Sequence, residues 1–184
     1  MVAYVRGDRA AFGMLFARFA PRLRAFFANS FGRGTIVQDL IQTTFMKLHD
    51  SRHRYDGAQR LRPWLFTIAS RVRLDALRQR YRHLHTLTEV DVDTLEGPFA
   101  DGDRIQEANE TAQRVRDAVV GLPEGQRIVV HLHRFEGLSF AEIAIALGIE
   151  EGTVRVRAHR AYGKLRASLA DRTERAEGGV EDAP

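Results

Sequence analysis

The chain of 184 residues contains no cysteine. This absence excludes a disulfide framework, a zinc site with cysteine ligands and a thiol redox switch within these residues. Long apolar runs are also missing, because no stretch approaches the roughly 20 residues that a membrane-spanning helix requires. The N-terminus lacks the apolar core of a signal peptide. We therefore expect a cytoplasmic protein without membrane insertion.

Lysine is nearly absent as well, although the chain is basic. Of its 28 basic residues all but Lys47 and Lys164 are arginine, and the formal net charge is +4. Arginine forms bidentate contacts with phosphates and guanine edges better than lysine does. The bias is typical of a nucleic-acid-binding protein, and a GC-rich genome would produce it equally.

Basic and acidic residues are separated along the chain. Residues 60–82 hold seven arginines and one acid, residues 84–110 hold eight acids and one arginine, and residues 153–166 hold five basic residues and no acid. Two basic segments separated by an acidic one favour two nucleic-acid contacts joined by a linker that avoids the polyanion. One such segment alone could be a solvated helix face.

The hydrophobic periodicity is helical throughout, so we expect an all-α fold. A first amphipathic helix would begin behind an N-cap at Asp8, and Pro21 should kink or interrupt it near Ala20. Further helices are predicted over about 35–50, 62–82, 104–120 and 124–135. The apolar residues that fall on helical spacing in this first helix are Phe12, Leu15, Phe16, Phe19, Leu23, Phe26 and Phe27.

The composition divides the chain into two small helical domains, over 1–83 and 104–170. Residues 84–103 contain six of the eight acids of the acidic segment together with glycine and proline, so they bury little and are predicted to form a flexible acidic linker. Residues 171–184 are polar and include two adjacent glycines, which predicts a disordered tail.

Residues 139–166 have the pattern of a helix-turn-helix. Ser139 and Glu142 match a capping box, Gly148 can end the short helix with a positive φ, and acidic residues open the second helix. The second helix would place a basic face in a DNA major groove and flank it with phosphate contacts. An αα-hairpin with a solvated basic face is the alternative. The predicted DNA contacts are Arg155, Val156, Arg157, His159, Arg160 and Lys164.

Motifs in both halves resemble bacterial extracytoplasmic-function (ECF) sigma factors, which contain regions two and four only. VQDLIQTTFMKL at 37–48, PWLFTIA at 63–69 and LDALR at 74–78 are similar to region two. LPEGQR at 122–127, GLSFAEIA at 137–144, LGI at 147–149 and GTVR at 152–155 are similar to region four. Both regions occur in order over roughly residues 4–170, which is more specific than either half alone.

The resemblance implies a sigma factor that binds core RNA polymerase and directs it to promoters. In this family the helix with the Asp-Leu-x-Gln pattern docks on the coiled coil of the β′ subunit, and the β flap is a second polymerase contact. An anti-sigma factor that masks these surfaces is a further implied partner. The implied polymerase contacts are Asp39, Gln42, Thr43 and Met46.

The resemblance also assigns promoter DNA to the two basic segments. The helix after Pro63 and the loop before it would bind and melt the −10 element, and the helix-turn-helix would bind the −35 element. A lone tryptophan on a helix is more often a core residue, so Trp64 has a structural alternative. The implied −10 contacts are Arg60, Arg62, Trp64, Arg71, Arg78 and Arg82.

Two positions depart from the family pattern. Arg71 stands where an asparagine commonly helps to recognise the −10 element, and Val156 stands where the reading helix usually carries serine. Valine can contact a thymine methyl group but cannot form a hydrogen bond. The resemblance therefore leaves the promoter sequence open.

Nothing in the sequence predicts catalysis, a metal site or a cofactor. His131 and His133 are two residues apart and would point in different directions from a helix, and no phosphate-binding loop or nucleophile elbow is present. Two other function classes stay open: a free-standing helix-turn-helix regulator that does not bind polymerase, and an interaction protein that has lost DNA opening. The Asp39/Gln42 helix disfavours the first, and Arg71 is the only support for the second.

Overall fold

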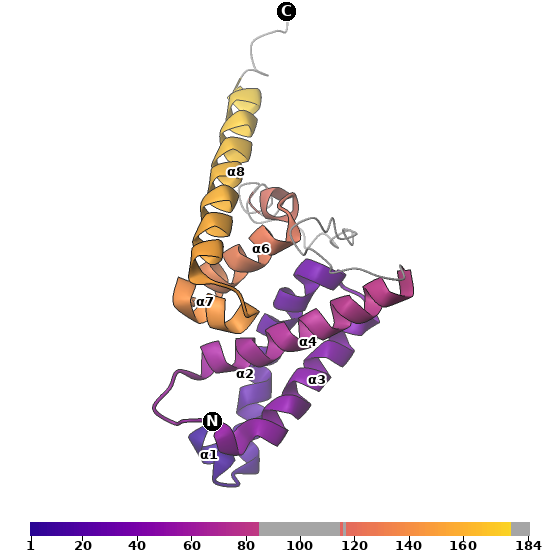
Figure 1. The fold of residues 1–184 in the computed structure, drawn as a ribbon, viewed down its shortest axis with the longest axis vertical. Coiled ribbons are helices and arrows are strands. Elements are labelled where there is room, and N and C mark those ends of the chain that lie inside the picture. Colours follow the sequence, from indigo (N-terminus) through magenta and orange to yellow (C-terminus); the bar gives the residue numbers. More distant parts are fainter. Residues whose placement is uncertain (85–114, 116, 178–184) are drawn as a thin grey trace, which may run out of the picture.

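The computed structural model describes residues 1–84, 115 and 117–177, and within these ranges it contains helices and no strand. Figure 1 shows α2, α3 and α4 packed as one unit, with α6, α7 and α8 packed at one end of it. The predicted all-α fold is confirmed for the described residues. The helices are α1 (Val2–Val5), α2 (Arg9–Phe31), α3 (Thr35–Ser51), α4 (Leu61–Leu84), α6 (Glu124–Val130), α7 (Phe140–Leu147) and α8 (Glu151–Glu177).

Helix α2 is one continuous helix, so the interruption expected near Ala20 is wrong. Asp8 caps it as predicted, because its carboxylate accepts the amides of the second and third helical residues at 2.8 and 3.2 Å. Pro21 lies inside the helix and removes one backbone donor, which costs about 3 kcal/mol. Phe19 and Leu23 are buried on either side of it. Burial of two large side chains, at about 1.5–3 kcal/mol each, offsets that cost.

Two helix ends differ from the sequence prediction. The helix expected over 124–135 is regular only to Val130, and His131–Phe135 form a wider π-helical turn that the Glu136 amide closes by donating to the His131 carbonyl at 3.2 Å. Helix α8 reaches Glu177 and includes half of the predicted tail 171–184, because five of the seven residues before the glycine at position 178 are arginine, glutamate or alanine, which are good helix formers. The predicted linker after residue 84 and most of the predicted helix 104–120 lie outside the described residues.

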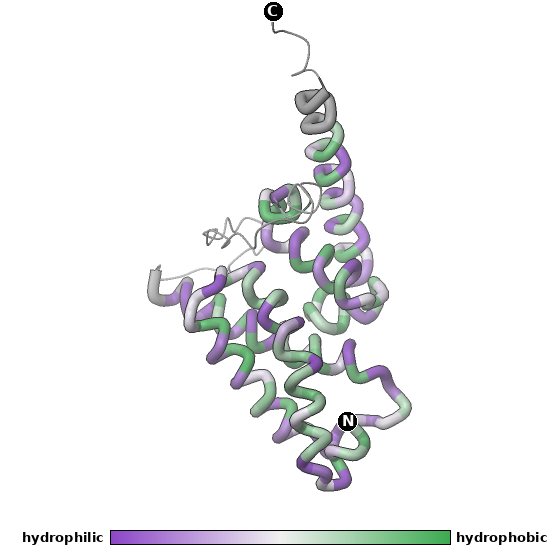
Figure 2. Tube along the Cα trace, turned by 180° about the vertical axis from the view of Figure 1, so that it is seen from behind, coloured by the Kyte–Doolittle hydropathy of each residue, from purple (hydrophilic) through white to green (hydrophobic). Residues whose placement is uncertain are grey.

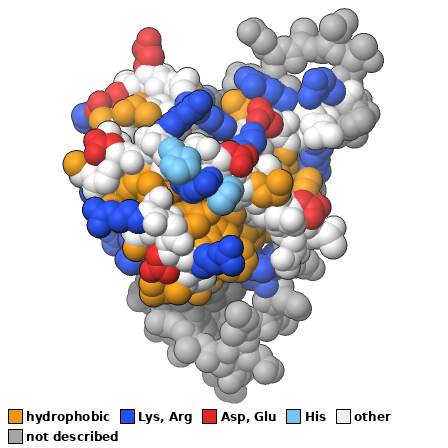
Figure 3. Space-filling view, turned by 90° about the horizontal axis from the view of Figure 1, so that it is seen from below, with side chains coloured by type: hydrophobic (Ala, Val, Ile, Leu, Met, Phe, Trp, Pro, Cys, Tyr) orange, Lys and Arg blue, Asp and Glu red, His pale blue; other side chains and the backbone are white. Residues whose placement is uncertain are grey.

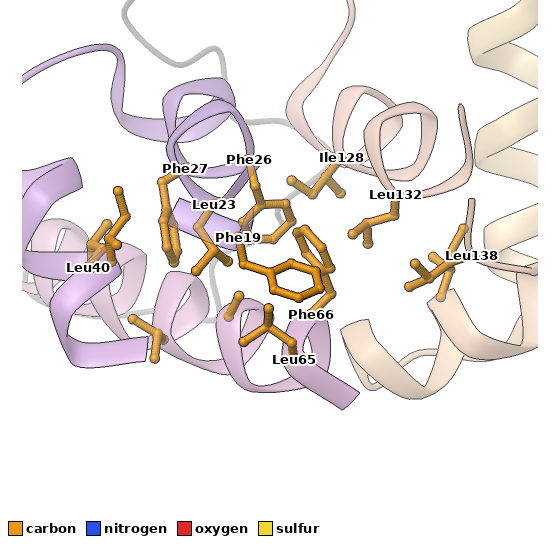
Figure 4. Close-up of a cluster of buried hydrophobic side chains, with 14 of the residues drawn as sticks. Phe19, Leu23, Phe26, Phe27, Leu40, Leu65, Phe66, Ile128, Leu132 and Leu138 are labelled. Atoms are coloured by element: carbon orange, nitrogen blue, oxygen red, sulfur yellow. The ribbon is translucent and has the colours of Figure 1, made fainter. Parts of the chain in front are cut away.

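One apolar core crosses the predicted domain boundary. Figure 4 shows side chains from α2, α3 and α4 in the same cluster as side chains from α6 and the turns beside α7. The ring centroids of Phe26 and Phe66 are 5.3 Å apart in an edge-to-face arrangement, and the ring centroid of His131 lies 5.8 Å from that of Phe26. The cluster includes Phe19, Leu23, Phe26, Phe27, Leu40, Leu65 and Phe66 from the first unit, and Ile128, Leu132 and Leu138 from the second.

The helices are amphipathic, and Figure 2 shows hydrophobic and hydrophilic residues alternating along them. Burial follows this pattern in α3, where one face is buried against α2 and α4 and the other is exposed. No helix within the described ranges is both long and apolar enough to span a membrane. The exposed faces of α3, α4 and α8 include the residues predicted from the sequence to contact polymerase and DNA.

Candidate DNA- and polymerase-binding surfaces

The predicted helix-turn-helix is formed by α7 and α8. The Ser139 hydroxyl accepts the Glu142 amide at 3.2 Å, and the Glu142 carboxylate accepts the Ser139 amide at 2.7 Å, so the capping box is complete. Gly148 ends α7 with φ +69°, a conformation that glycine adopts without strain. The predicted capping box and the predicted glycine C-cap are both confirmed, and they define the two ends of α7 in the helix-turn-helix.

Helix α8 buries one face and exposes the face that would meet DNA. Val154, Ala158 and Ala161 are at most 2% exposed, which anchors the helix on α6 and α7. The opposite side is open to solvent, and its Val156 is 49% exposed. The exposed residues on that side are Arg155, Val156, His159, Arg160 and Lys164.

Arg155 is held by residues of its own motif. Its Nε donates to Glu151 at 3.0 Å, and its guanidinium lies 5.5 Å above the Phe140 ring. Exposed ion pairs one helical turn apart contribute about 0.3–0.5 kcal/mol. Arg155 can therefore leave this pair for a DNA base or phosphate at small cost.

Arg157 differs from its neighbours because it is half-buried rather than exposed. It lies near Arg73 of α4: burial lowers the pKa of Arg73, and the Arg157 charge lowers it further while Glu124 opposes the shift. Arg157 is therefore less accessible than the other predicted contacts of α8, and its role as a phosphate contact stays a prediction.

The outer face of α3 carries the residues that the sequence assigned to polymerase. Asp39 and Gln42 are exposed, Met46 is 59% exposed, and Thr43 is half-buried beside them. The other side of α3 is buried through Leu40 and its neighbours. An exposed methionine beside a carboxylate and an amide gives this face both polar and apolar contact chemistry.

An apolar groove of about 840 Å³ lies next to this face, between α1, α2 and α3. Figure 3 looks at this end of the molecule and shows hydrophobic side chains gathered among basic ones. Gln42 and Met46 border both the groove and the outer face of α3. The aromatic lining consists of Tyr4, Phe12, Phe16 and Phe45, with His49 at its edge.

The −10 candidates on α4 fall into separate environments. Arg71, Arg78 and Arg82 are exposed and spaced at i, i+7 and i+11 along the helix. Trp64 is half-buried, packs against the core and lies 5.1 Å from the Tyr55 ring. This environment favours its structural alternative over a free stacking surface.

Arg60 and Arg62, at the start of α4, contact the second unit. Arg62 Nη1 donates to the Glu136 carbonyl at 2.7 Å, and Arg60 Nη2 donates to the Gly137 carbonyl at 3.1 Å. Arg60 Nη2 also lies 3.6 Å from the Glu142 carboxylate. Two residues that the sequence assigned to DNA are therefore bonded to the segment that precedes and opens α7.

A buried polar network joins the two units, and the sequence analysis missed it. Arg73 of α4 pairs with Glu124 of α6 at 2.6 Å and donates to Ser30 of α2 at 2.7 Å. Both members of the ion pair are almost fully buried, at 4% and 3% exposure of their side chains. Arg127 continues the network by donating to the Asn29 carbonyl at 2.9 Å. These contacts lie across the predicted domain boundary.

A second part of the network surrounds Glu136. Its carboxylate lies 3.1 Å from Arg22 and 3.8 Å from His131 Nε2. Burial raises the pKa of Glu136, which the Arg22 hydrogen bond and charge oppose, and burial lowers the pKa of His131 to about 4. Asn29 Nδ2 donates to His131 Nδ1 at 3.0 Å, as a neutral imidazole permits.

One signal in the sequence could have identified Arg73. It stands seven residues after Phe66 and four after Ala69, both of which belong to the inner stripe of α4. An arginine within an apolar stripe needs an acidic partner. Its partner, 51 residues away, cannot be found from helical spacing.

The comparisons with known proteins agree with this architecture. The family model for sigma-70 region 2 matches residues 15–83, and that for sigma-70 region 4 matches residues 112–165. RNA polymerase sigma factor CarQ of Myxococcus xanthus is 39% identical over 166 residues, covering 90% of this chain and 92% of CarQ. ECF RNA polymerase sigma factor SigF of Caulobacter vibrioides is 34% identical over 179 residues, covering 97% and 94%.

A solved structure is similar across the same length. It is the sigma factor RpoE in complex with the anti-sigma factor NepR from Bartonella quintana, with a TM-score of 0.64, 27% identity and coverage of 87% of this chain and 97% of that one. Sigma factors are not an enzyme family. The two matched regions, the full-length relatives and the shared architecture show that the chain belongs to the ECF sigma factors of bacterial RNA polymerase.

Proposed function

We propose that this chain carries core RNA polymerase to promoters through three helix faces. The outer face of α3 binds the polymerase, α4 and the loop before it bind the −10 element, and α8 binds the −35 element. One observation carries the proposal: a polar, methionine-bearing face on α3 and a basic face on α8 are both exposed in one chain, while the opposite side of each helix is buried.

The α3 face suits a helical protein partner. Asp39 and Gln42 are separated by three residues, so their side chains are neighbours on one side of the helix. A carboxylate there can accept hydrogen bonds from basic or amide groups of the β′ coiled coil, and the amide can both donate and accept. Met46 adds apolar contact area that adapts to its partner. The β flap would be the second polymerase contact, through the helix-turn-helix unit.

The α4 face suits a single strand of DNA. Arg71, Arg78 and Arg82 form a basic row that can follow a phosphate backbone. Separating paired and stacked bases costs a few kcal/mol, which backbone contacts and capture of an unstacked base can offset. Arg60 and Arg62 would extend this row at its N-terminal end.

The α8 face suits duplex DNA. Arg155 and Arg160 can donate to guanine edges, His159 can bond to a base or phosphate, and Val156 can contact a thymine methyl group. Lys164, one turn further on, is placed for a phosphate. Chemistry on the nucleotide substrates belongs to the polymerase, so the chain needs no catalytic group or cofactor.

The proposal includes an anti-sigma factor and a cytoplasmic site of action. The similar RpoE structure is a complex with the anti-sigma factor NepR, which supports a regulator of the same class for this chain. A partner that covered the α3 face would compete directly with polymerase. Bacterial polymerase and chromosomal DNA share the cytoplasm, which places the proposed activity there.

Binding to core RNA polymerase without DNA tests the proposal. A fluorescently labelled chain is titrated with core enzyme, and an Asp39→Ala, Gln42→Ala variant runs beside it. Loss of two charged or polar interface contacts should weaken binding about tenfold or more. The matched control is Asp56→Ala, Gln59→Ala, which removes the same two residue types from exposed positions in the loop before α4, away from the outer face of α3.

The outcomes separate the two DNA-binding classes. Tight binding that the Asp39/Gln42 variant loses and the control keeps supports the proposal. A folded, monodisperse chain that binds DNA but shows no affinity for polymerase would favour a free-standing helix-turn-helix regulator. Equal losses in both variants would show that the effect is not specific to the outer face of α3 and would contradict the proposed polymerase contact.

A further inference from the structure

Arg155, on the exposed face of α8, contacts two residues of its own helix-turn-helix. The Glu151 carboxylate, one helical turn earlier, accepts from Nε at 3.0 Å and from Nη2, both through the same oxygen. The guanidinium carbon also lies 5.5 Å from the centre of the Phe140 ring, at the start of α7. The carboxylate and the ring therefore limit the directions in which the Arg155 side chain can point.

The Phe140 ring is held by contacts of its own. The His133 ring lies 4.6 Å from it, centre to centre, and His133 Nδ1 donates to the Leu138 carbonyl at 2.9 Å. Phe140 also packs against the apolar core. Attraction between a guanidinium and an aromatic ring depends on the position of the cation over the ring. A ring that is fixed in this way supports one orientation of Arg155.

The Glu151 contact uses one edge of the guanidinium and leaves another edge available. Arginine has five N–H donors in a planar fork. Glu151 accepts from Nε and from one N–H of Nη2, so Nη1 and the second N–H of Nη2 can still donate as a parallel pair. Arginine recognises guanine O6 and N7 through two such donors. Arg155 can therefore keep its contact with Glu151 and read a guanine at the same time.

A DNA phosphate is the competing ligand for Arg155. In the free chain the side chains of Arg155 and Glu151 are 63% and 40% exposed, so their ion pair is weak. DNA in contact with α8 would displace water, which strengthens the pair and raises the cost of leaving the carboxylate without a partner. If Arg155 turned to a phosphate, Glu151 would be left unpaired beside a polyanion. Glu151 therefore favours the guanine over the phosphate.

We propose that Glu151 and Phe140 are positioning residues that direct Arg155 to a guanine edge and so determine the base preference of α8 at one position of its DNA site. This inference rests on the proposed function only in taking α8 as the helix that reads duplex DNA. Glu151 itself repels phosphates, because it carries their sign of charge. It raises selectivity while it lowers affinity, which a purely structural residue would not do.

Selection from a random duplex library measures base preference, and a separate titration measures affinity. The full chain and its variants are incubated with duplexes of about 30 base pairs at about 100 mM salt, and the bound fraction is sequenced. The position that Arg155 reads is the one whose guanine preference disappears in Arg155→Ala. Fluorescence anisotropy with one mixed-sequence duplex gives the affinity that does not depend on sequence.

In Glu151→Gln we expect the guanine preference at that position to fall about tenfold, while preferences at other positions stay within about twofold. Affinity for the mixed-sequence duplex should rise about twofold, because a negative charge is lost. Glu150→Gln is the matched control: it removes the same charge from the adjacent exposed position and should change no base preference.

Two further variants test the contacts themselves. Phe140→Leu keeps an apolar side chain and removes the ring, so the guanine preference should fall about threefold at the same position. In an Arg155→Ala background, Glu151→Gln should cause no further change in base preference, because the residue that it positions is gone. Circular dichroism confirms that each variant is folded.

Three results would overturn the proposal. If no guanine preference of the parent chain depends on Arg155, that residue does not read a base. If the preference is unchanged in both Glu151→Gln and Phe140→Leu, the two residues do not position Arg155. An equal loss of preference in Glu150→Gln would assign the effect to charge at the start of α8. Polymerase is absent from these measurements, so their failure is distinguishable from failure of the polymerase titration.

Discussion

Replacing either member of the buried Arg73–Glu124 pair should lower the free energy of unfolding by more than the loss of an exposed ion pair would. We consider Arg73→Met, Glu124→Leu and the double variant. Each single change leaves one charge in a site where the side chains are 4% and 3% exposed. Removing one member of such a pair typically costs 3–5 kcal/mol, because the remaining charge is desolvated and unpaired.

The structure places the expected cost at about 3 kcal/mol. Arg73 keeps one hydrogen bond, to Ser30 at 2.7 Å, when Glu124 is removed, which favours the lower end of that range. Against a total stability of about 5–15 kcal/mol, this is a large loss. The double variant replaces the pair by apolar side chains, so it should cost about 3 kcal/mol or less rather than the roughly 6 kcal/mol expected from addition.

Urea unfolding followed by circular dichroism measures all four chains of this cycle. The exposed Glu151–Arg155 pair provides the control, since Glu151→Gln should change stability by about 0.5 kcal/mol or less. If each single variant lost less than about 1 kcal/mol of unfolding free energy and the two losses simply added in the double variant, the reasoning would be refuted, because water would then reach the pair in solution. A smaller slope of the unfolding free energy against urea concentration in the single variants would indicate that the units separate before they unfold.

Two further predictions concern pH and the helix-turn-helix. The folded pKa of His131, about 4, is below its unfolded value of about 6.5, so the unfolded chain binds the proton first and stability falls as the pH drops through this window. From pH 7.5 to 5 the loss from this residue is about 2 kcal/mol, and His131→Gln should lose correspondingly less over that range in urea titrations, whereas identical pH profiles would contradict the assignment. Ser139→Ala removes the capping hydroxyl and should cost about 1 kcal/mol, with Ser139→Thr close to the parent; thermal unfolding by circular dichroism checks both, and an equal loss in the two variants would exclude the cap as the cause.

Local chemistry made much of the fold predictable. Asp8, Ser139 and Gly148 act at helix ends through atoms within a few residues, so the sequence determines their caps directly. The exposed and buried sides of α3 and α8 follow from 3.6-residue periodicity in the same way. The positions of the exposed faces on α3 and α8 therefore follow from the sequence alone.

The contacts between the two units could not be predicted from local sequence patterns. Arg73 and Glu124 are separated by 51 residues, and Arg22 and Glu136 by 114, so no helical spacing relates them. Pro21 gives a second example: its local preference predicts a kink or an interruption, and the helix nevertheless continues through it because Phe19 and Leu23 are buried in the core. Charge alone also counted Arg73 among the seven arginines of a segment assigned to nucleic-acid contact, since composition does not distinguish a buried arginine from an exposed one.

The buried Arg73–Glu124 pair also limits which parts of related proteins can be exchanged. One residue belongs to the unit that contains α4 and the other to the unit that contains α6. A chimaera that takes one unit from a relative with an apolar pair would bring a buried charge against a side chain that cannot neutralise it. Substitutions at these two positions should therefore be inherited together. The unit that contains α6 can be transplanted only when the unit that contains α4 carries the matching residue.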